Sequence, residues 1–227
     1  MMAWIDSLSQ NIKASIIVMV ALMIVLSLIG KKIGKLSPRD KPRGVVFIAV
    51  MFVDTINRFI QEFYGKQWRR FAPILTAIFL YLVFANTAGL FGLATPLANM
   101  SVALSMSLIA FLTIQGAGIS VRGPLNRLKD LSSPNPLLLP LNLVSEISTP
   151  VAMGLRLFGN LLTGSVIFVL VYNLLPHIAA TFFTAVLIHP VFNIGFGVIQ
   201  AMVYFMLLTI FVSMAIEDAS IDSEKSS

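Results

Sequence analysis

The sequence predicts an all-α integral membrane protein with about five transmembrane helices, one interfacial amphipathic helix, and a last pair of long, tilted helices that form an antiparallel hairpin. Two features of the composition predict this class. Of the 227 residues, 57% are hydrophobic and only 11% are charged, whereas a soluble domain carries about 25% charged residues. The basic residues gather in short clusters between apolar runs, as cytoplasmic loops of membrane proteins do. We therefore predict a single membrane domain over residues 1–227.

The composition also excludes several classes of site. The chain has no cysteine and only two histidines, so disulfides and thiolate metal sites are excluded and a zinc site is not expected. No basic face remains once the apolar runs are removed, so nucleic-acid binding is not expected. The sequence shows no nucleophile with a base and an orienting group, no phosphate-binding loop and no acidic metal cluster. We expect no cofactor, no metal, no catalytic residue and no covalent chemistry by the chain itself.

The first apolar run predicts a transmembrane helix over residues 12–30. Apart from Lys13 at its start, the lysines of this region follow the run, and no A-x-A cleavage site comes after it, so we interpret it as a retained helix and not as a signal peptide. The strongly basic stretch that follows, residues 31–43, is expected on the cytoplasmic side. The N-terminus is then expected outside.

An interfacial helix is predicted over residues 44–63. Its fully apolar part, residues 45–53, is too short to cross a hydrocarbon core of about 30 Å. Basic clusters lie at both ends of the segment, so a true span would place one of them on the outer side. A helix lying on the cytoplasmic surface satisfies both observations. One polar face recurs at helical spacing and consists of Asp54, Asn57, Arg58 and Gln61.

Two further spans are predicted over residues 71–93 and 100–119, joined by a short outer turn. The segment after them, residues 120–136, carries three basic residues and is expected in the cytoplasm.

The last two apolar segments, residues 137–175 and 178–216, are unusually long. Each reaches roughly 55 to 60 Å as a continuous helix, close to twice the thickness of the hydrocarbon core. Their middles contain Pro150 and Pro190, which bend a helix. We predict two long, tilted, bent helices that form an antiparallel hairpin. Residues 217–227 are expected to form an acidic cytoplasmic tail.

Arg156 stands alone in the first long segment. The nearest lysine or arginine residues on the two sides are Lys129 and Lys225. An arginine keeps its proton at ordinary pH, so it acts as a fixed charge. Glu146 is the one carboxylate inside the predicted spans, which suggests that another chain supplies the partner of Arg156. Helical spacing places this arginine on one polar stripe: Ser145, Thr149, Ala152, Arg156, Asn160 and Thr163.

A second stripe is predicted on the other long segment. Folding the hairpin at Pro176 brings Arg156 and Gln200 to similar depth, so we expect the two to be near neighbours that face outward together. We also expect Gly197 to leave room for the arginine side chain. The members of this second stripe are His189, Asn193, Gly197, Gln200 and Tyr204.

Other interpretations of these residues stay open at this point. Arg156 can snorkel to an interface, and Asn160 can join helices by hydrogen bonding. His189 can be a packing residue, and Glu146 can be solvated at the cytoplasmic end. For the whole chain, two rival hypotheses are a secondary transporter that binds an anionic substrate at Arg156 and a purely structural membrane scaffold.

The stretch TPVAMGLRLFGNLLTG, followed by GVIQAMVYFMLLTIFVSMAIED, closely resembles subunit a of bacterial F-type ATP synthases. The resemblance implies the stator of a rotary motor in the bacterial plasma membrane, with the C-terminus in the cytoplasm. It implies as partners a ring of c subunits whose carboxylates face Arg156, the b subunits of the peripheral stalk, other synthase subunits, and H⁺ or Na⁺. Arg156 then separates two offset half-channels. The residues assigned to ion translocation are Arg156, Asn160, Gln200, Glu146, Ser145, Ser148, His189, Asn193, Ser105 and Asn99.

Two positions depart from that family's pattern. Ser165 stands where many members carry an ionisable residue, and Asn193 stands where many carry a histidine or a carboxylate. The resemblance therefore leaves both H⁺ and Na⁺ open as the coupling ion, and it leaves open which residues handle the ion on the outer side.

Overall fold

The computed structural model describes residues 10–34, 44–91, 94–124, 139–188 and 190–224. Within these ranges every regular element is helical and no strand occurs. The elements in chain order are α2 (Gln10–Gly34), α3 (Val45–Tyr64), η1 (Gly65–Gln67), α4 (Trp68–Thr87), η2 (Ala88–Phe91), η3 (Pro96–Ala98), α5 (Met100–Arg122), α7 (Leu139–Leu174), α8 (His177–Phe183), η5 (Thr184–Ile188), η6 (Pro190–Phe196) and α9 (Gly197–Glu224).

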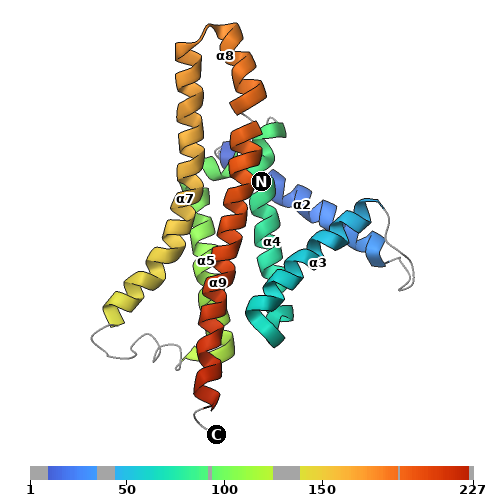
Figure 1. Cartoon of the computed structure of the whole chain (residues 1–227), viewed down its shortest axis with the longest axis vertical. Coiled ribbons are helices and arrows are strands. Elements are labelled where there is room, and N and C mark those ends of the chain that lie inside the picture. The colour runs from blue at the N-terminus through green and yellow to red at the C-terminus, as the bar shows by residue number, and fades with distance from the viewer. Residues whose placement is uncertain (1–9, 35–43, 92–93, 125–138, 189, 225–227) are drawn as a thin grey trace, which may run out of the picture.

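Five of the described helices are long and apolar enough to cross a membrane, namely α2, α4, α5, α7 and α9. The predicted class, an all-α membrane protein with about five spans, is confirmed. Figure 1 shows α4, α5 and α9 along the long axis of the molecule, while α2 and α3 run obliquely to one side. Where the sequence predicted a separate tail from residue 217, α9 continues as a helix to Glu224.

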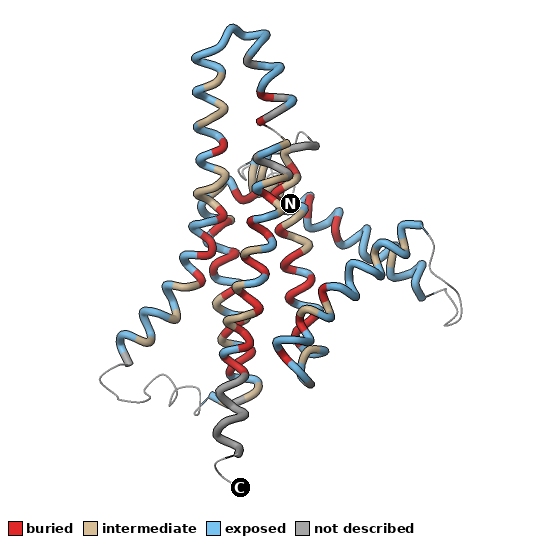
Figure 2. Tube along the Cα trace, viewed as in Figure 1, coloured by how far each residue is buried: buried red, intermediate tan, exposed pale blue. Residues whose placement is uncertain are grey.

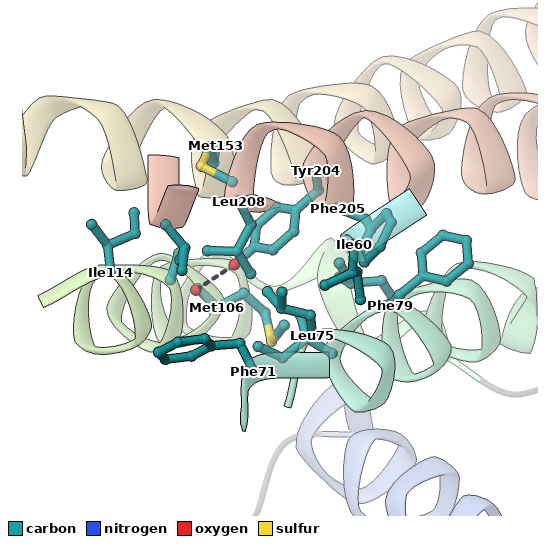
Figure 3. Packing of buried hydrophobic residues seen from close by; sticks show 14 of the residues in the cluster. Ile60, Phe71, Leu75, Phe79, Met106, Ile114, Met153, Tyr204, Phe205 and Leu208 are labelled. Atoms are coloured by element: carbon teal, nitrogen blue, oxygen red, sulfur yellow. Dashed lines mark hydrogen bonds between the residues drawn. The ribbon is translucent and has the colours of Figure 1, made fainter. Parts of the chain in front are cut away.

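The core lies around α9, which packs on α4, α5 and α3. Its inward positions recur every three or four residues, and the largest side chains among them, such as Tyr204 and Leu208, are almost fully buried. Figure 2 shows buried residues concentrated in this central group, with exposed residues on α2, α3 and the α7–α8 end. In Figure 3 the Tyr204 ring lies among Leu208 and Met106, and its hydroxyl donates to the Met106 carbonyl oxygen at 2.7 Å.

The amphipathic helix α3 docks on this core through one face. Ile56, Ile60 and Tyr64 are buried, while Asp54 and Arg58 are exposed and paired with each other at 3.2 Å. The Tyr64 hydroxyl donates to the Thr209 carbonyl oxygen of α9 at 2.9 Å. Burial raises the pKa of the Tyr64 phenol above its ordinary value, so the group stays a donor. The polar face predicted from the sequence points away from the bundle.

Helix α2 attaches to the bundle by a few contacts near its start. The Ser15 and Tyr81 hydroxyls lie 2.6 Å apart, and the Asn11 amide donates to the Thr95 carbonyl oxygen at 2.9 Å. Most of its remaining side chains are exposed and apolar, including Met23 and Leu28. Such a surface is suited to lipid, which solvates apolar side chains.

The two long segments form the predicted hairpin but differ in their internal structure. Helix α7 is continuous over 36 residues with Pro150 inside it, and at 1.5 Å per residue it is about 54 Å long. Figure 1 shows its lower half turning away from α5 and α9, a change of direction that a proline produces. The second segment is not one α-helix, because η5 and η6 are π-helical. Pro190 lacks a backbone donor, so the regular hydrogen-bond ladder cannot pass through it.

Helices α5 and α7 cross closely at Gly154. A Cβ atom added to Gly154 would lie 2.6 Å from the Ala103 carbonyl oxygen and would overlap the Ser107 hydroxyl. Small residues at such a crossing let two backbones approach closely, which is the main source of helix association in lipid. The crossing therefore requires glycine at this position.

Gly154→Ala is expected to destabilise the protein, because the added methyl group must displace α5. We expect a loss of about 1–3 kcal/mol in the free energy of unfolding, the usual cost of overpacking. Denaturation in mixed micelles, followed by circular dichroism, measures this loss.

Gly159→Ala on the same helix is the matched control, because a Cβ atom there meets nothing within 4 Å. Alanine favours a helix over glycine by about 0.5–1 kcal/mol, so this variant should be unchanged or more stable. Equal losses in the two variants would contradict the packing assigned to Gly154.

Candidate functional site

Arg156 lies at the midpoint of α7, with residues 139–155 before it and 157–174 after it. Its side chain is exposed on the surface of the chain. Within the described residues its guanidinium makes no ion pair. The nearer end of α7 is about 25 Å away along the axis. Arg156 is therefore a fixed cation presented to whatever lies beside the middle of α7.

The predicted polar stripe on α7 is a surface stripe. Ser145, Ala152 and Thr163 are exposed like Arg156, and Thr149 and Asn160 are half-buried. The Thr149 hydroxyl donates to the Ser145 carbonyl oxygen at 3.1 Å, and the Thr163 hydroxyl donates to the Gly159 carbonyl oxygen at 2.9 Å. Both bonds lie within the helix and leave the stripe open to the outside of the chain.

Asn160 connects this stripe to α9. Its amide nitrogen donates to the Gln200 side-chain oxygen at 2.6 Å. Asn160 lies one helical turn after Arg156, so the bond holds Gln200 at about that depth. The hairpin that turns at Pro176 thus brings the two long segments together at similar depth, as predicted from the sequence.

The second predicted stripe does not share the exposed face. Gln200 is only 7% exposed and Tyr204 only 1% exposed, so the expectation that Gln200 faces outward beside Arg156 is wrong. The reason is the position of α9, which is covered by α4 and α5 on the side that carries these residues. Gln200 therefore meets Arg156 from inside the protein, through Asn160.

Gly197 has a different role from the one expected. A Cβ atom there would lie 2.9 Å from the Asn86 Cβ atom, so the glycine makes room for Asn86 of α4 and not for Arg156. The Asn86 amide donates to the Gly197 carbonyl oxygen at 3.1 Å, and Asn86 is only 2% exposed. This contact fixes the start of α9 against α4, three residues before Gln200.

A hollow of about 120 Å³ lies where these elements meet, large enough for several water molecules. Among the residues that the structure describes, its lining carries neutral polar groups and no titratable side chain. Among the described residues, no three histidine or acidic side chains gather as a metal site would require. The polar lining residues are Asn86, Thr95, Asn160, Ser165 and Gln200.

The other predicted residues lie elsewhere. Glu146 is half-buried on the lower half of α7, ten positions before Arg156, and Ser145 and Ser148 are exposed beside it. Asn99 caps α5, because its side-chain oxygen accepts from the Ser101 backbone nitrogen at 2.9 Å. The Ser105 hydroxyl donates to the Ser101 carbonyl oxygen at 2.8 Å. Neither Asn99 nor Ser105 lines the hollow.

Two predicted residues are outside what the structure describes: His189 as a whole and the side chain of Asn193.

Asn86 is the residue that the sequence reasoning missed. It is the one amide in the apolar segment 71–93, and a lone amide in a predicted span is a signal for a buried hydrogen bond. Ser165 was noted from the sequence as a departure from a family pattern, and the structure places it in the lining of the hollow. Spacing along one helix cannot show that α4 and α7 contribute to the same cavity.

Comparison with known proteins assigns the chain to one group. The family model described as "ATP synthase A chain" matches residues 13–213. "ATP synthase subunit a 1" of Crocosphaera subtropica is 29% identical over 211 residues, which cover 92% of this chain and 87% of that protein. "ATP synthase subunit a" of Sulfurihydrogenibium sp. is 26% identical over 217 residues, covering 93% and 99%. "ATP synthase subunit a, sodium ion specific" of Propionigenium modestum is 28% identical over 188 residues, covering 74% and 63%.

The bond between Asn160 and Gln200 is expected to couple α7 to α9 energetically. Asn160→Leu or Gln200→Leu alone leaves one amide without its partner, at a cost of about 1–3 kcal/mol. The double variant should lose less free energy of unfolding than the sum of the losses in the two single variants, and the difference, the coupling energy, should be about 0.6–2 kcal/mol. Denaturation of the unchanged protein, the two single variants and the double variant in mixed micelles gives the four free energies of unfolding from which the coupling energy is calculated.

Asn173→Leu provides the control, because the Asn173 amide donates to the Val169 carbonyl oxygen within its own helix. Combined with Gln200→Leu it should be additive. Additivity of the Asn160 and Gln200 changes as well would contradict the coupling.

Proposed function

The chain belongs to the ATP synthase A chain family, and from this premise we propose that Arg156 is the fixed charge separating two offset half-channels in its ion-translocating stator. Relatives named ATP synthase subunit a support the role in the membrane sector of the complex, and they do not favour the alternative of a secondary transporter. The proposal concerns how this chain moves the ion. One observation supports the proposal most directly: an exposed arginine lies at the midpoint of α7, the longest apolar helix described.

A cation in this position needs an external partner. An arginine cannot lose its proton there, and a charge at the centre of a bilayer is costly unless it is paired or hydrated. No described carboxylate pairs with it. We propose that the partner is the carboxylate of each passing c subunit, which Arg156 attracts and thereby strips of its ion. Because the guanidinium stays in place, the ion cannot pass directly from one approach to the other.

The hollow beside Asn160 is proposed as one of the two approaches. It reaches the Asn160–Gln200 pair, which lies one turn from Arg156 on α7. The described residues of its lining carry neutral polar groups, and we propose that the ion crosses it among water molecules and neutral oxygen atoms. This lining is compatible with H⁺ or Na⁺, and the surroundings of the c-subunit carboxylate then decide between them.

The second approach is proposed along the lower half of α7. Ser145, Ser148 and Glu146 lie there, on or near the exposed stripe that leads to Arg156. The two approaches reach the arginine from opposite halves of one helix. An ion that moves between them crosses the membrane field, which is worth about 2.3 kcal/mol per 100 mV. A leak past Arg156 would dissipate this energy.

The proposed setting is the bacterial plasma membrane, with the N-terminus outside and the C-terminus in the cytoplasm. The basic clusters at residues 31–43 and 66–70 support this orientation by the positive-inside rule. Helix α3 is proposed to lie on the cytoplasmic surface, with its polar face free for other subunits such as the b subunits of the peripheral stalk.

Arg156→Ala is expected to reduce ATP synthesis in membrane vesicles to background while the subunit still inserts and the complex assembles. Arg156→Lys should fail as well or nearly so, because an ammonium is more strongly hydrated and lacks the planar fork of the guanidinium. Respiration-driven ATP synthesis and ATP-driven ion pumping, with assembly checked by native gels, measure the effect.

Arg58→Ala is the control, since Arg58 is exposed and already paired with Asp54; it should leave both rates close to those of the unchanged protein. Synthesis at the normal rate in an assembled Arg156→Ala complex would refute the mechanism.

Helix α3 is expected to keep both ends on one side of the membrane. Cysteines introduced at Val45, the first residue of the helix, and at Gln67, three residues after its end, should react with an impermeant maleimide from the cytoplasmic side only, since both positions are exposed. Labelling in right-side-out and inverted vesicles distinguishes the sides. Reaction of the two positions from opposite sides would make α3 a span.

A further inference from the structure

From the residues at the start of α4 and the end of α5, we propose that this protein binds a phospholipid with a negatively charged headgroup. A hollow of about 390 Å³ lies there, lined by Gln67, Arg69, Arg70, Ser120 and Val121. A second hollow of about 510 Å³ adjoins it on the side of α3, and Arg69 borders both. This region is remote from Arg156 in the chain and is used by no step of the proposed ion path.

The charges in the hollow are of one sign. Arg69 and Arg70 are exposed, and neither forms an ion pair with a described residue. They lie in the first turn of α4, which contains no acidic residue and receives no side-chain cap from Gln67. The N-terminus of a helix is itself partly positive. Two arginines at this end add to that potential instead of balancing it, so the hollow attracts an anion.

Aromatic rings hold the two guanidiniums that would bind this anion. The Arg69 guanidinium lies over the Trp68 ring, 5.6 Å from its centroid, and the Arg70 guanidinium lies 6.0 Å from the centroid of the Phe71 ring. Such contacts hold a guanidinium in position without neutralising it. Tryptophan also favours the headgroup level of a membrane, and the apolar span of α4 begins at this residue. The two guanidiniums are therefore placed where lipid phosphates lie.

The surface below the cations is apolar and open. Ile74, one turn after Arg70, is 52% exposed, and Ile119, next to Ser120, is 45% exposed. A phosphate that accepts hydrogen bonds from the arginines would have its acyl chains beside these residues. Basic pockets between transmembrane helices bind anionic headgroups in this way.

The described residues of the lining include two arginines and no acidic group, which favours an anionic lipid over a zwitterionic one. A zwitterionic headgroup would bring its own ammonium next to the two guanidiniums, which repel it. Arginine also binds phosphate oxygens in a bidentate manner. Phosphatidylglycerol is a suitable probe because it carries the phosphate without a cation.

The test uses the assembled complex in nanodiscs of phosphatidylcholine that contain a small fraction of a photoreactive lipid, either phosphatidylglycerol or phosphatidylcholine. After illumination, mass spectrometry measures labelling of peptides from the start of α4 and the end of α5. We expect the phosphatidylglycerol probe to label them about tenfold more than the phosphatidylcholine probe. Equal labelling by the two probes would overturn the proposal.

Variants identify the residues responsible. Arg69→Gln and Arg70→Gln should each reduce the preference about fivefold, the effect of one cation near a membrane surface. Arg58→Gln is the matched control, because it removes an exposed arginine of α3 that is already paired with Asp54, and it should change nothing. The single variants keep the other cations of the cluster at 66–70, so insertion and orientation are preserved. An unchanged preference in both variants would assign the labelling to bulk lipid and contradict the site.

Two further outcomes would also contradict it. Competition by millimolar inorganic phosphate would identify a site for a free anion. Cross-linking of the same peptides to an acidic segment of another subunit, with loss of the lipid signal, would identify a protein interface.

Discussion

The helices of this protein hold together with little help from the hydrophobic effect, because lipid chains solvate an apolar side chain about as well as a neighbouring helix does. Close backbone approach and buried hydrogen bonds must supply the association. Gly154 provides the approach between α5 and α7. Tyr64 and Tyr204 each donate from a buried ring to a backbone carbonyl oxygen of another helix. Both tyrosine bonds involve α9, which also packs on α3, α4 and α5, so α9 is the axis of the fold.

The same constraint determines the surroundings of Arg156. Helix α7 contacts the bundle through its inward face, at residues such as Met153 and Leu157, which are almost fully buried. The opposite face, with Arg156 at its midpoint, has no described helix against it. The hydrogen bond from Asn160 to Gln200 joins α7 to α9 one turn after Arg156. A cation is thus held firmly by the backbone of a packed helix while its charge remains available to a partner, as the role proposed for Arg156 requires.

The π-helical turns before α9 separate this site from the α7–α8 end of the hairpin. Wide turns of this kind change the phase of a helix and are frequent at functional sites. Because η5 (Thr184–Ile188) and η6 (Pro190–Phe196) are π-helical, a period of 3.6 residues does not hold from this region through to Gln200. The start of α9 is instead fixed by Asn86, which donates to the Gly197 carbonyl oxygen. The register of Gln200 therefore depends on α4 as much as on its own helix.

The sequence by itself determined the membrane class, the length of α7, the amphipathic character of α3 and the isolation of Arg156, because apolar run length, helical period and charge position are local properties of the chain. The stripe on α7 was also predictable, since residues three and four apart share a helix face whatever surrounds it. Only the tertiary structure decided that Gln200 and Tyr204 face inward, that Gly197 accommodates Asn86, and that Asn99 caps α5. Helical spacing shows which residues share a face, whereas the neighbour that covers that face is chosen by the packing of helices far apart in the sequence.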